Sequence, residues 1–385
     1  MSFCNYFGQG LDLSVHQNKL VMKPCCLYDF NDDMESTEQG AVWKVPIDDI
    51  TKNTLVQKLQ NYIKHSAEQN KKQKGCWVCI EQDSSGLGSL RKKSFEYDNK
   101  QAKIHSLTLE ADYRCNLACA ICGPKHSSTW YAQADPRNKP HYYSSTAFKH
   151  SKAYVPIRQT IIESVLDLDL SNLQWVKIAG GEPLYSDSHI QVIKGITDRC
   201  DPKKISLTYT TNFSVLPNEE TLSLWKKFKR IEFSASIDGV GDQFHFLRWP
   251  YRFDKLKKNI KKLQEICGSN TVFKIEHTLN PLNILDTDKM IGFITNTLPS
   301  NKFGDRTEFN MHSCHGVELA LQNTPLDLRE AVYKKYGKEH KISRILQNTA
   351  HTENNREVIN YLDNISVARQ LDWRSIFPEA QKYFI

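Results

Sequence analysis

Short apolar segments alternate with longer amphipathic segments from about residue 107 to residue 311. Six segments have the length and the apolar or alternating pattern of strands: residues 106–110, 175–179, 206–210, 230–236, 273–278 and 308–312. Five others repeat apolar residues at helical spacing: residues 160–166, 190–199, 219–227, 253–266 and 288–297. This alternation predicts an α/β fold with a parallel sheet and helices packed outside it. In parallel α/β folds, active sites lie at the carboxyl ends of the strands, so the residues just past each strand are candidates for the site.

The residues on either side of the alternating region follow other patterns. Residues 47–64 have helical periodicity and lie between two groups of cysteines. Residues 316–385 contain no cysteine, and their helical periodicity leads to the sequences DWR at 372–374 and FPE at 377–379. We expect three parts: an N-terminal domain over residues 1–100, a barrel-like region over 101–315, and a structural helical segment over 316–385 that packs on the core.

The composition is that of an ordinary globular protein, with 39% hydrophobic and 25% charged residues among 385. Polar residues interrupt any N-terminal apolar run, and no segment reaches the roughly 20 apolar residues that span a bilayer. We therefore expect a cytoplasmic protein without a membrane partner. The net charge of +7 comes from lysines spread along the chain, which is typical of solvated helix faces. Attraction to an anionic substrate is the alternative interpretation.

Three cysteines stand close together directly after the first candidate strand. Cys115, Cys119 and Cys122 have the spacing C-x-x-x-C-x-x-C, and a Gly-Pro pair follows the last of them. A [4Fe-4S] cluster normally takes four cysteines, so a three-cysteine site leaves one iron open to another ligand. Zinc is the alternative, but zinc sites usually contain a second ligand pair, and none follows within reach.

This spacing, on a loop directly after a strand, resembles the radical S-adenosylmethionine (SAM) enzymes. The resemblance implies a partial (β/α)6 barrel of the TIM type and a [4Fe-4S] cluster whose open iron holds the amino and carboxylate groups of SAM. It also implies reductive cleavage of SAM to a 5'-deoxyadenosyl radical, a cofactor chemistry for which the protein supplies binding and orientation. The electron would come from an external donor such as flavodoxin or ferredoxin.

The segment just past the second candidate strand reads Gly180-Gly181-Glu182-Pro183. Two glycines let a backbone approach a ligand closely, and a carboxylate beside them can accept hydrogen bonds from an ammonium group. By resemblance this is the GGEP motif, whose backbone and glutamate contact the amino group of SAM. An ordinary turn is the alternative for two glycines that stand alone.

Further candidates for SAM contacts follow the later strands. Asn212 lies past the third strand, and Ser236 and Asp238 lie in the sequence SIDG past the fourth. The resemblance places such residues near SAM, although Asn, Ser and Asp also cap strands routinely. Arg248 could pair with the SAM carboxylate as a bidentate donor, or it could form a surface ion pair. The adenine is expected near Ile121, where many family members carry an aromatic residue.

Five cysteines precede the loop, namely Cys4, Cys25, Cys26, Cys76 and Cys79. Four thiolates satisfy either zinc or a complete iron-sulfur cluster, and their spacing does not separate the two. The FC near the start, the PCC at 24–26, the C-x-x-C at 76–79 and the CGPxxSSxW at 122–130 resemble the twitch-domain radical SAM proteins, a shortened form of the SPASM group. The resemblance implies an auxiliary [4Fe-4S] cluster on Cys4, Cys76 and Cys79, completed by either Cys25 or Cys26.

Two residues past the sixth candidate strand are candidates for substrate chemistry, His312 and Cys314. A histidine can accept a proton as a substrate radical is oxidised, and a cysteine can return a hydrogen atom. The alternative is that Cys314 is a small buried core residue. The predicted function is radical SAM oxidation or modification of a small polar molecule or a peptide. A redox-neutral isomerase or epimerase that uses Cys314 is the second possibility, and a zinc-stapled basic nucleic-acid-binding protein is the alternative of another class.

Overall fold

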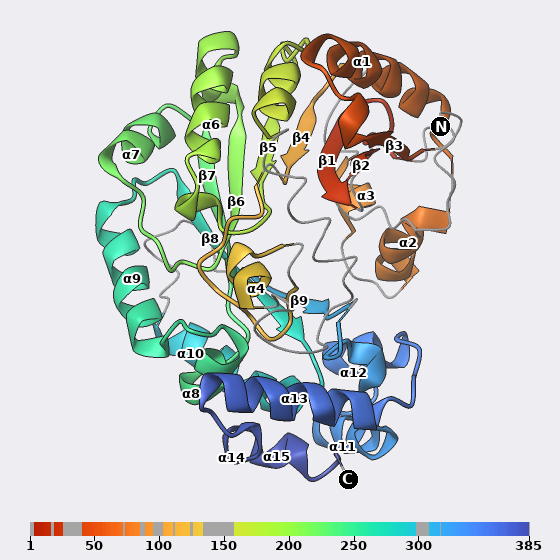
Figure 1. The fold of residues 1–385 in the computed structure, drawn as a ribbon, viewed down its shortest axis with the longest axis vertical. Coiled ribbons are helices and arrows are strands. Elements are labelled where there is room, and N and C mark those ends of the chain that lie inside the picture. Colours follow the sequence, from red (N-terminus) through yellow and green to blue (C-terminus); the bar gives the residue numbers. More distant parts are fainter. Residues whose placement is uncertain are drawn as a thin grey trace. The chain divides into compact units, whose positions relative to one another are not determined.

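The computed structural model describes residues 4–16, 19–25, 41–71, 74–84, 89–94, 103–110, 112–123, 126–133, 158–297, 308–315 and 317–384 (Figure 1). The chain divides into two compact units. The first unit comprises Met1–Arg114, Thr146–Thr210 and Pro217–Ile231. The second unit comprises Cys115–Ser145, Thr211–Leu216 and Glu232–Ile385. Both units therefore combine segments that are distant in the sequence.

The sheet of the first unit has the strand order β3-β2-β1-β4-β5-β6. Its strands are β1 (Gly10–His16), β2 (Lys19–Lys23), β3 (Trp43–Pro46), β4 (Ser106–Leu109), β5 (Trp175–Ile178) and β6 (Ser206–Thr211). Strands β3, β2 and β1 pair antiparallel, whereas β1, β4 and β5 pair parallel and β5 pairs parallel with β6. The N-terminal segment thus extends the parallel sheet by three strands. The domain boundary near residue 100 stays a prediction.

Side chains cap the first turn of two helices of the first unit, α1 and α7. The helices of this unit are α1 (Lys52–Glu68), α2 (Trp77–Ser84), α3 (Leu90–Ser94), a helix over 158–166, α6 (Ser188–Arg199) and α7 (Glu219–Trp225). Helix α1 starts with a capping box, in which the side chains of Thr51 and Thr54 accept hydrogen bonds from each other's backbone N–H. At the start of α7, the side chain of Asn218 accepts a hydrogen bond from the backbone N–H of Thr221.

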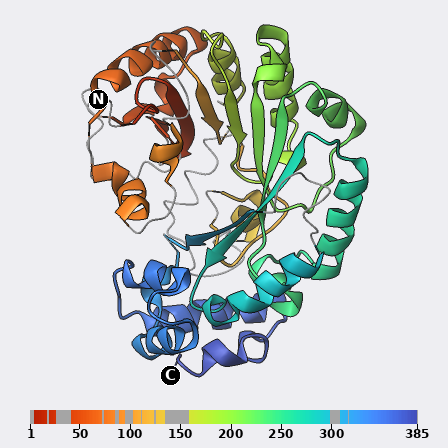
Figure 2. The same ribbon diagram turned by 180° about the vertical axis from the view of Figure 1, so that it is seen from behind.

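The second unit contains the parallel pair β8 (Thr271–Leu279) and β9 (Glu308–Ser313), and most of β7 (Arg230–Ser236). Strand β8 alternates between buried residues such as Phe273 and Ile275 and half-buried polar residues such as Lys274 and Glu276. Its helices are α4 (Ser128–Gln133), α8 (Gly241–Leu247), α9 (Phe253–Ile266), α10 (Thr287–Thr297), α11 (Leu326–Tyr336), α12 (Lys341–Gln347), α13 (Asn355–Arg369), α14 (Trp373–Ile376) and α15 (Pro378–Gln381). Figure 2 shows β8 and β9 from behind; along the chain α9 precedes β8, and α10 lies between the two strands.

The C-terminal helices share one apolar core with the loop that carries the three cysteines. Leu362 from α13 and Phe377 after α14 belong to the same buried cluster as Ala118, Ala120 and Trp130. Burial of apolar area on this scale is the main favourable term in folding. The helices within residues 317–384 therefore pack on the core of the second unit.

The fold class predicted from the hydrophobic pattern is confirmed. All six candidate strands form, as β4 to β9, with ends that differ from the prediction by at most two residues. Helix α9 covers the predicted range 253–266, and the C-terminal segment is helical. The structure is thus an α/β fold with a parallel sheet, as the resemblance to a partial barrel implies. Among the described residues, the helices are too short or too polar to cross a membrane.

Candidate functional site

The three candidate cluster ligands lie in an irregular segment between β4 and α4. We refer to residues 115–122 as the cysteine loop. Cys115 and Cys119 are buried, and Cys122 is half-buried. Burial raises the pKa of the Cys119 thiol, while the nearby guanidinium of Arg248 opposes that rise. A buried thiol beside a cation can ionise when a metal or cluster takes the sulfur as a ligand.

Side chains of the sequence SSTW at 127–130 hold the backbone of the cysteine loop. The hydroxyls of Ser128 and Thr129 donate to the carbonyl of Cys115 at 3.0 and 2.7 Å. The indole N–H of Trp130 donates to the carbonyl of Cys119 at 2.7 Å. The serine, threonine and tryptophan of this motif therefore have a physical role, because they satisfy carbonyl groups that the irregular loop leaves free.

Nitrogen donors reach the sulfur atoms of two of the three cysteines. The backbone N–H of Leu117 and the amide of Asn212 lie 3.4 and 3.8 Å from the Cys115 sulfur. The guanidinium of Arg248 lies 3.8 Å from the Cys119 sulfur. Cluster-bound thiolates accept hydrogen bonds of this kind, which help to set the reduction potential. The donor set of the cysteine loop therefore fits an iron-sulfur cluster.

Arg248 is fixed by a buried ion pair with Asp238. The carboxylate of Asp238 accepts from Nε of Arg248 at 2.5 Å and also contacts its Nη2, and the two side chains are 12% and 0% exposed. The other oxygen of Asp238 accepts from the backbone N–H of Thr278 at 2.7 Å. The interpretation of Arg248 as a surface ion pair is therefore wrong, because its partner carboxylate is fully buried. Asp238 orients Arg248 toward the cysteine loop.

The remaining SAM-contact candidates of the second unit are Ser236 and Ile121. Ser236 is the last residue of β7 and is half-buried. Ile121 is partly buried against the core that also contains Ala120. Neither placement tests a contact with SAM, so both assignments stay predictions.

The two candidates for substrate chemistry lie in contrasting surroundings. The His312 side chain is 49% exposed and its Nε2 contacts the carboxylate of Glu276 on β8. Asn310 donates to the same carboxylate at 3.2 Å. Cys314 is only 2% exposed and belongs to the apolar core, where burial raises the pKa of its thiol. The structure therefore favours the interpretation of Cys314 as a core residue.

The GGEP motif lies in the first unit, against the residues that precede the cysteine loop in the chain. The backbone N–H groups of Gly181 and Glu182 donate to the carbonyls of Asp112 and Arg114, both at 2.8 Å. A Cβ on Gly180 would lie 2.3 Å from the Asp112 carbonyl oxygen, and Gly180 has a φ of +119°. Only glycine tolerates this approach and this backbone conformation.

Glu182 and Pro183 shape the end of the motif. Glu182 is buried, and its side chain accepts from the backbone N–H of Leu184 at 3.1 Å at the start of a short 3₁₀ helix, η3 (Pro183–Tyr185). Proline suits the first position of a helix because its missing N–H is not needed there. The motif is thus a tight turn with a buried carboxylate.

Sequence reasoning missed a buried polar network around Asp112. The carboxylate of Asp112 accepts from Arg114 at 2.7 Å, from Arg158 at 2.9 Å and from Ser188 at 3.0 Å, and it also contacts Ser186. Burial disfavours ionisation of Asp112, but hydrogen bonds from Ser186 and Arg114 outweigh it and lower the pKa of this carboxyl. Asp112 also lines a cavity with Glu182 and His189. An acidic residue three positions before Cys115 was the available signal.

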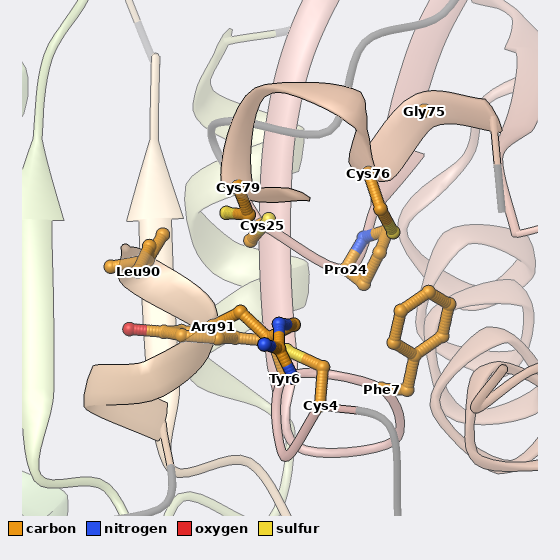
Figure 3. Close-up of a pocket in the computed structure, with 10 residues that line it drawn as sticks. All are labelled: Cys4, Tyr6, Phe7, Pro24, Cys25, Gly75, Cys76, Cys79, Leu90 and Arg91. Carbon is orange, nitrogen blue, oxygen red and sulfur yellow. The ribbon is translucent and has the colours of Figure 1, made fainter. Parts of the chain in front are cut away.

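The N-terminal cysteines line one pocket of the first unit (Figure 3). We refer to it as the cysteine pocket. Cys4 precedes β1, Cys25 follows β2, Cys76 lies directly before α2, and Cys79 lies in the first turn of α2. The pocket encloses about 340 Å³ of empty space, part of it open to solvent. Cys26, the alternative fourth ligand, lies outside the described residues.

Polar contacts in the cysteine pocket come from neighbouring turns and from α3. The backbone N–H of Cys4 donates to the Asn70 side chain at 2.9 Å, and its sulfur lies 3.6 Å from the hydroxyl of Ser94. Burial raises the pKa of the Cys79 thiol to about 11, and the nearby Cys4 and Cys76 add to the rise. In the part of the chain that the structure describes, no three His, Cys, Asp or Glu side chains are arranged around a single metal ion. The ligand assignments therefore stay predictions.

A family model described as the radical SAM superfamily matches residues 112–293. These residues, just under half of the chain, are thus similar to radical SAM domains. The matched residues begin at the Asp112 network and include the cysteine loop, the GGEP motif and the Asp238–Arg248 pair. The assignment explains why cysteines, glycines and polar residues follow successive strands of a parallel sheet.

Solved structures of radical SAM proteins resemble the chain only distantly. Native anSMEcpe with bound AdoMet and Cp18Cys peptide is 12% identical, with a TM-score of 0.37 over 60% of this chain and 59% of that chain. Streptococcus suis SuiB bound to S-adenosylmethionine is 12% identical, with a TM-score of 0.35 over 94% of this chain and 70% of that chain. The chain thus spans about three fifths of the length of anSMEcpe. No curated protein sequence matches it significantly.

Proposed function

We propose that the protein cleaves SAM reductively and uses the resulting 5'-deoxyadenosyl radical to abstract hydrogen from a C–H bond of a small polar molecule or a peptide. A [4Fe-4S] cluster bound with SAM would supply the electron transfer and the radical chemistry. The observation that carries the proposal is the cysteine loop, where nitrogen donors approach the sulfurs of Cys115 and Cys119. Flavodoxin or ferredoxin is the proposed type of electron donor.

The chain's own residues have three tasks in this proposal. Cys115, Cys119 and Cys122 hold the cluster, and the SSTW segment fixes their backbone. Arg248, anchored by Asp238, directs its remaining donors toward the cysteine loop. The GGEP turn is proposed to bind the amino group of SAM through its backbone and Glu182, with Asn212, Ser236 and Ile121 as further cofactor contacts.

We propose an auxiliary [4Fe-4S] cluster in the cysteine pocket, held by Cys4, Cys25, Cys76 and Cys79. Support comes from the position of all four cysteines on the wall of one pocket, although three separate segments contribute them. Cys4, Cys25 and Cys76 also pack in a single apolar cluster, and a dry shell of this kind controls solvent access to a metal site. This arrangement supports the twitch-like interpretation of the N-terminal residues. Zinc in the pocket is the outcome that would count against it.

For the substrate step we propose His312 as proton acceptor, with Glu276 orienting its ring. The support is an accessible imidazole in contact with a half-buried carboxylate. In the presence of a substrate, H312Q and E276Q should keep formation of 5'-deoxyadenosine but lose product. C314A should retain product, because the buried Cys314 has no proposed role. Loss of product in C314A alone would instead support the isomerase or epimerase function.

The test of the proposed function is an anaerobic measurement of iron, sulfide and 5'-deoxyadenosine. The wild type is compared with a variant that carries Cys115→Ala, Cys119→Ala and Cys122→Ala, each reduced by dithionite with SAM present. We expect about eight irons in the wild type and about four in the variant, with 5'-deoxyadenosine formed only by the wild type. About four irons in the wild type, together with full formation of 5'-deoxyadenosine, would indicate that the pocket holds zinc and no iron-sulfur cluster. A colourless wild type without 5'-deoxyadenosine would refute the proposal.

A further inference from the structure

Helix α13 contacts the cysteine loop through two buried side chains. Arg369 is 7% exposed, and its Nη2 donates to the carbonyl of Ala118 at 2.6 Å. The hydroxyl of Tyr361 is also buried and donates to the carbonyl of Ala120 at 2.6 Å. These two carbonyls flank Cys119 in the sequence. A helix more than two hundred residues further along the chain therefore holds the backbone on both sides of one candidate ligand.

Arg369 also binds the segment that carries Arg248. Its Nη1 donates to the carbonyl of Phe246 at 2.7 Å. The cysteine loop pairs with this same segment, because the N–H groups of Ala118 and Ala120 donate to the carbonyls of Trp249 and Leu247, both at 2.8 Å. The guanidinium of Arg369 thus joins two backbone segments. One contains Cys119, and the other contains Arg248, which donates to the Cys119 sulfur.

The charge of Arg369 lies among aromatic rings. Its guanidinium carbon lies 5.4 Å from the ring centroid of Trp130, 5.6 Å from that of Phe246 and 5.8 Å from that of Trp249. Cation–π contacts of this kind stabilise a desolvated cation. A charge in such surroundings acts over a longer distance than one in water, because little solvent screens it.

We propose that Arg369 is a positioning residue for the cluster, which fixes Cys119 relative to Arg248 and favours the reduced cluster through its buried positive charge. The inference rests on the proposed function, since it takes Cys115, Cys119 and Cys122 as the cluster ligands. Its physical basis is that net charge and hydrogen bonding around the sulfurs set the potential of an iron-sulfur cluster. The C-terminal helices therefore tune the cluster in addition to completing the core.

The experiment compares R369M and R369K with matched variants of a second buried arginine. Arg329 is also 7% exposed and also donates to backbone carbonyls, at 3.1, 2.9 and 2.9 Å, but these belong to Leu346, Thr349 and Ala350. R329M and R329K therefore control for the loss of a buried arginine in the same unit. The readouts are iron retained after dilution, the unfolding midpoint of the iron-free protein, and the midpoint potential of the cluster whose spectrum changes when SAM is added.

We expect R369M to lower the equilibrium constant for cluster reduction about tenfold, which is about 59 mV for a one-electron couple. R369K keeps the charge but loses the two-carbonyl contact, so it should retain the potential and lose iron faster than R329K. Unchanged potential in R369M together with unchanged iron retention in R369K would overturn the proposal. Equal iron loss in the Arg369 and Arg329 variants, with equal destabilisation and no change of potential, would also overturn it by showing a purely structural role.

Failure of the proposed function gives a different result from failure of this inference. If the wild type holds no cluster that depends on the three loop cysteines, the proposed function fails and the inference fails with it. If the wild type holds that cluster and the Arg369 variants match their Arg329 controls, the inference alone fails. If R369M does not fold, R369K against R329K still decides, because rapid iron loss supports the proposal and equal retention contradicts it.

Discussion

The cysteine loop and the cysteine pocket differ in how the chain assembles them. All three cysteines of the loop lie within residues 115–122, and their spacing alone places them together. The pocket depends on three separate segments: the turn before β1, the end of β2, and α2. A short loop can carry its chemistry in its sequence, whereas the pocket exists only after the strands and helices around it have folded.

The two sites also differ in the groups that approach the sulfur atoms. In the loop, nitrogen donors from Leu117, Asn212 and Arg248 approach two sulfurs. In the pocket, the Cys4 sulfur lies next to the hydroxyl of Ser94, backbone N–H groups of Leu90 and Arg91 approach the Cys79 sulfur, and the Arg91 guanidinium lies near Cys4. Because hydrogen bonds and nearby positive charge raise the reduction potential of a cluster, both sites contain groups that would favour reduction of a bound cluster.

The largest expected effect is the separation of the two sites by substitution. Cys79→Ala should remove about four of about eight irons while SAM cleavage continues, because the loop holds its own cluster. Cys25→Ala should have the same effect, whereas Cys26→Ala should not. Iron content and 5'-deoxyadenosine are the measurements, and Cys200→Ala, at a cysteine directly after α6 and outside both sites, serves as the control with full iron. Full iron in Cys25→Ala and half the iron in Cys26→Ala would show that Cys26, and not Cys25, is the fourth ligand in the pocket.

The next effect concerns the buried ion pair beside the loop. Asp238→Ala leaves Arg248 buried without its carboxylate, which should lower the free energy of unfolding by roughly 3–5 kcal/mol. Glu339→Gln breaks the exposed pair with Arg344 in the same unit, whose side chains are 87% and 42% exposed, and should cost no more than about 1 kcal/mol. Urea denaturation of the iron-free protein measures both.

The Asp238 variant also tests the link between this pair and the loop. Since Asp238 holds Arg248 toward the Cys119 sulfur, Asp238→Ala should also lose loop iron faster than Glu339→Gln does. Similar unfolding free energies for the two variants would show that the buried pair contributes little. The Cys79→Ala background offers a further control, because any iron lost there must come from the loop.

Periodicity predicted the fold because each strand and helix depends mainly on its own residues. Strands β4 to β9 and helix α9 follow directly from alternating and helical apolar patterns. The parallel pairing of β1 with β4 could not be predicted in this way, since it joins residues that are about a hundred positions apart. Nothing in either strand specifies its partner.

The functional residues, too, could be predicted only where they stand close together in the sequence. The three loop cysteines and GGEP were visible because several functional residues stand side by side in the sequence. The contact of Arg369 with Ala118 spans 251 positions, and that of Glu276 with His312 spans 36. A side chain that binds a backbone carbonyl places no demand on the identity of its partner, so it leaves no motif. Cys25 is proposed as the fourth pocket ligand because it lines the pocket, whereas Cys26 lies outside the described residues.

The smallest expected effect is a pH dependence of the first unit. Burial lowers the pKa of His189 to about 4, and His189 lines the same cavity as Asp112 and Glu182. The unfolded chain gains a proton at this residue below about pH 6.5, whereas the folded chain does so only near pH 4. The stabilising contribution is therefore complete above pH 6.5 and is lost as the pH falls from 6.5 to 4.

Comparison of the wild type with His189→Gln isolates this contribution from that of Asp12, whose pKa burial raises to about 7 and whose effect has the opposite sign. Between pH 6.5 and 4.5 the difference in unfolding free energy between the two proteins should change by about 2 kcal/mol, since one histidine contributes up to about 1.4 kcal/mol per pH unit. Urea denaturation at several pH values measures it. A constant difference across this range would show that His189 titrates alike in the folded and unfolded chains. If only the first unit loses stability as the pH falls, acid destabilises the unit with the cysteine pocket at a higher pH than the unit with the cysteine loop.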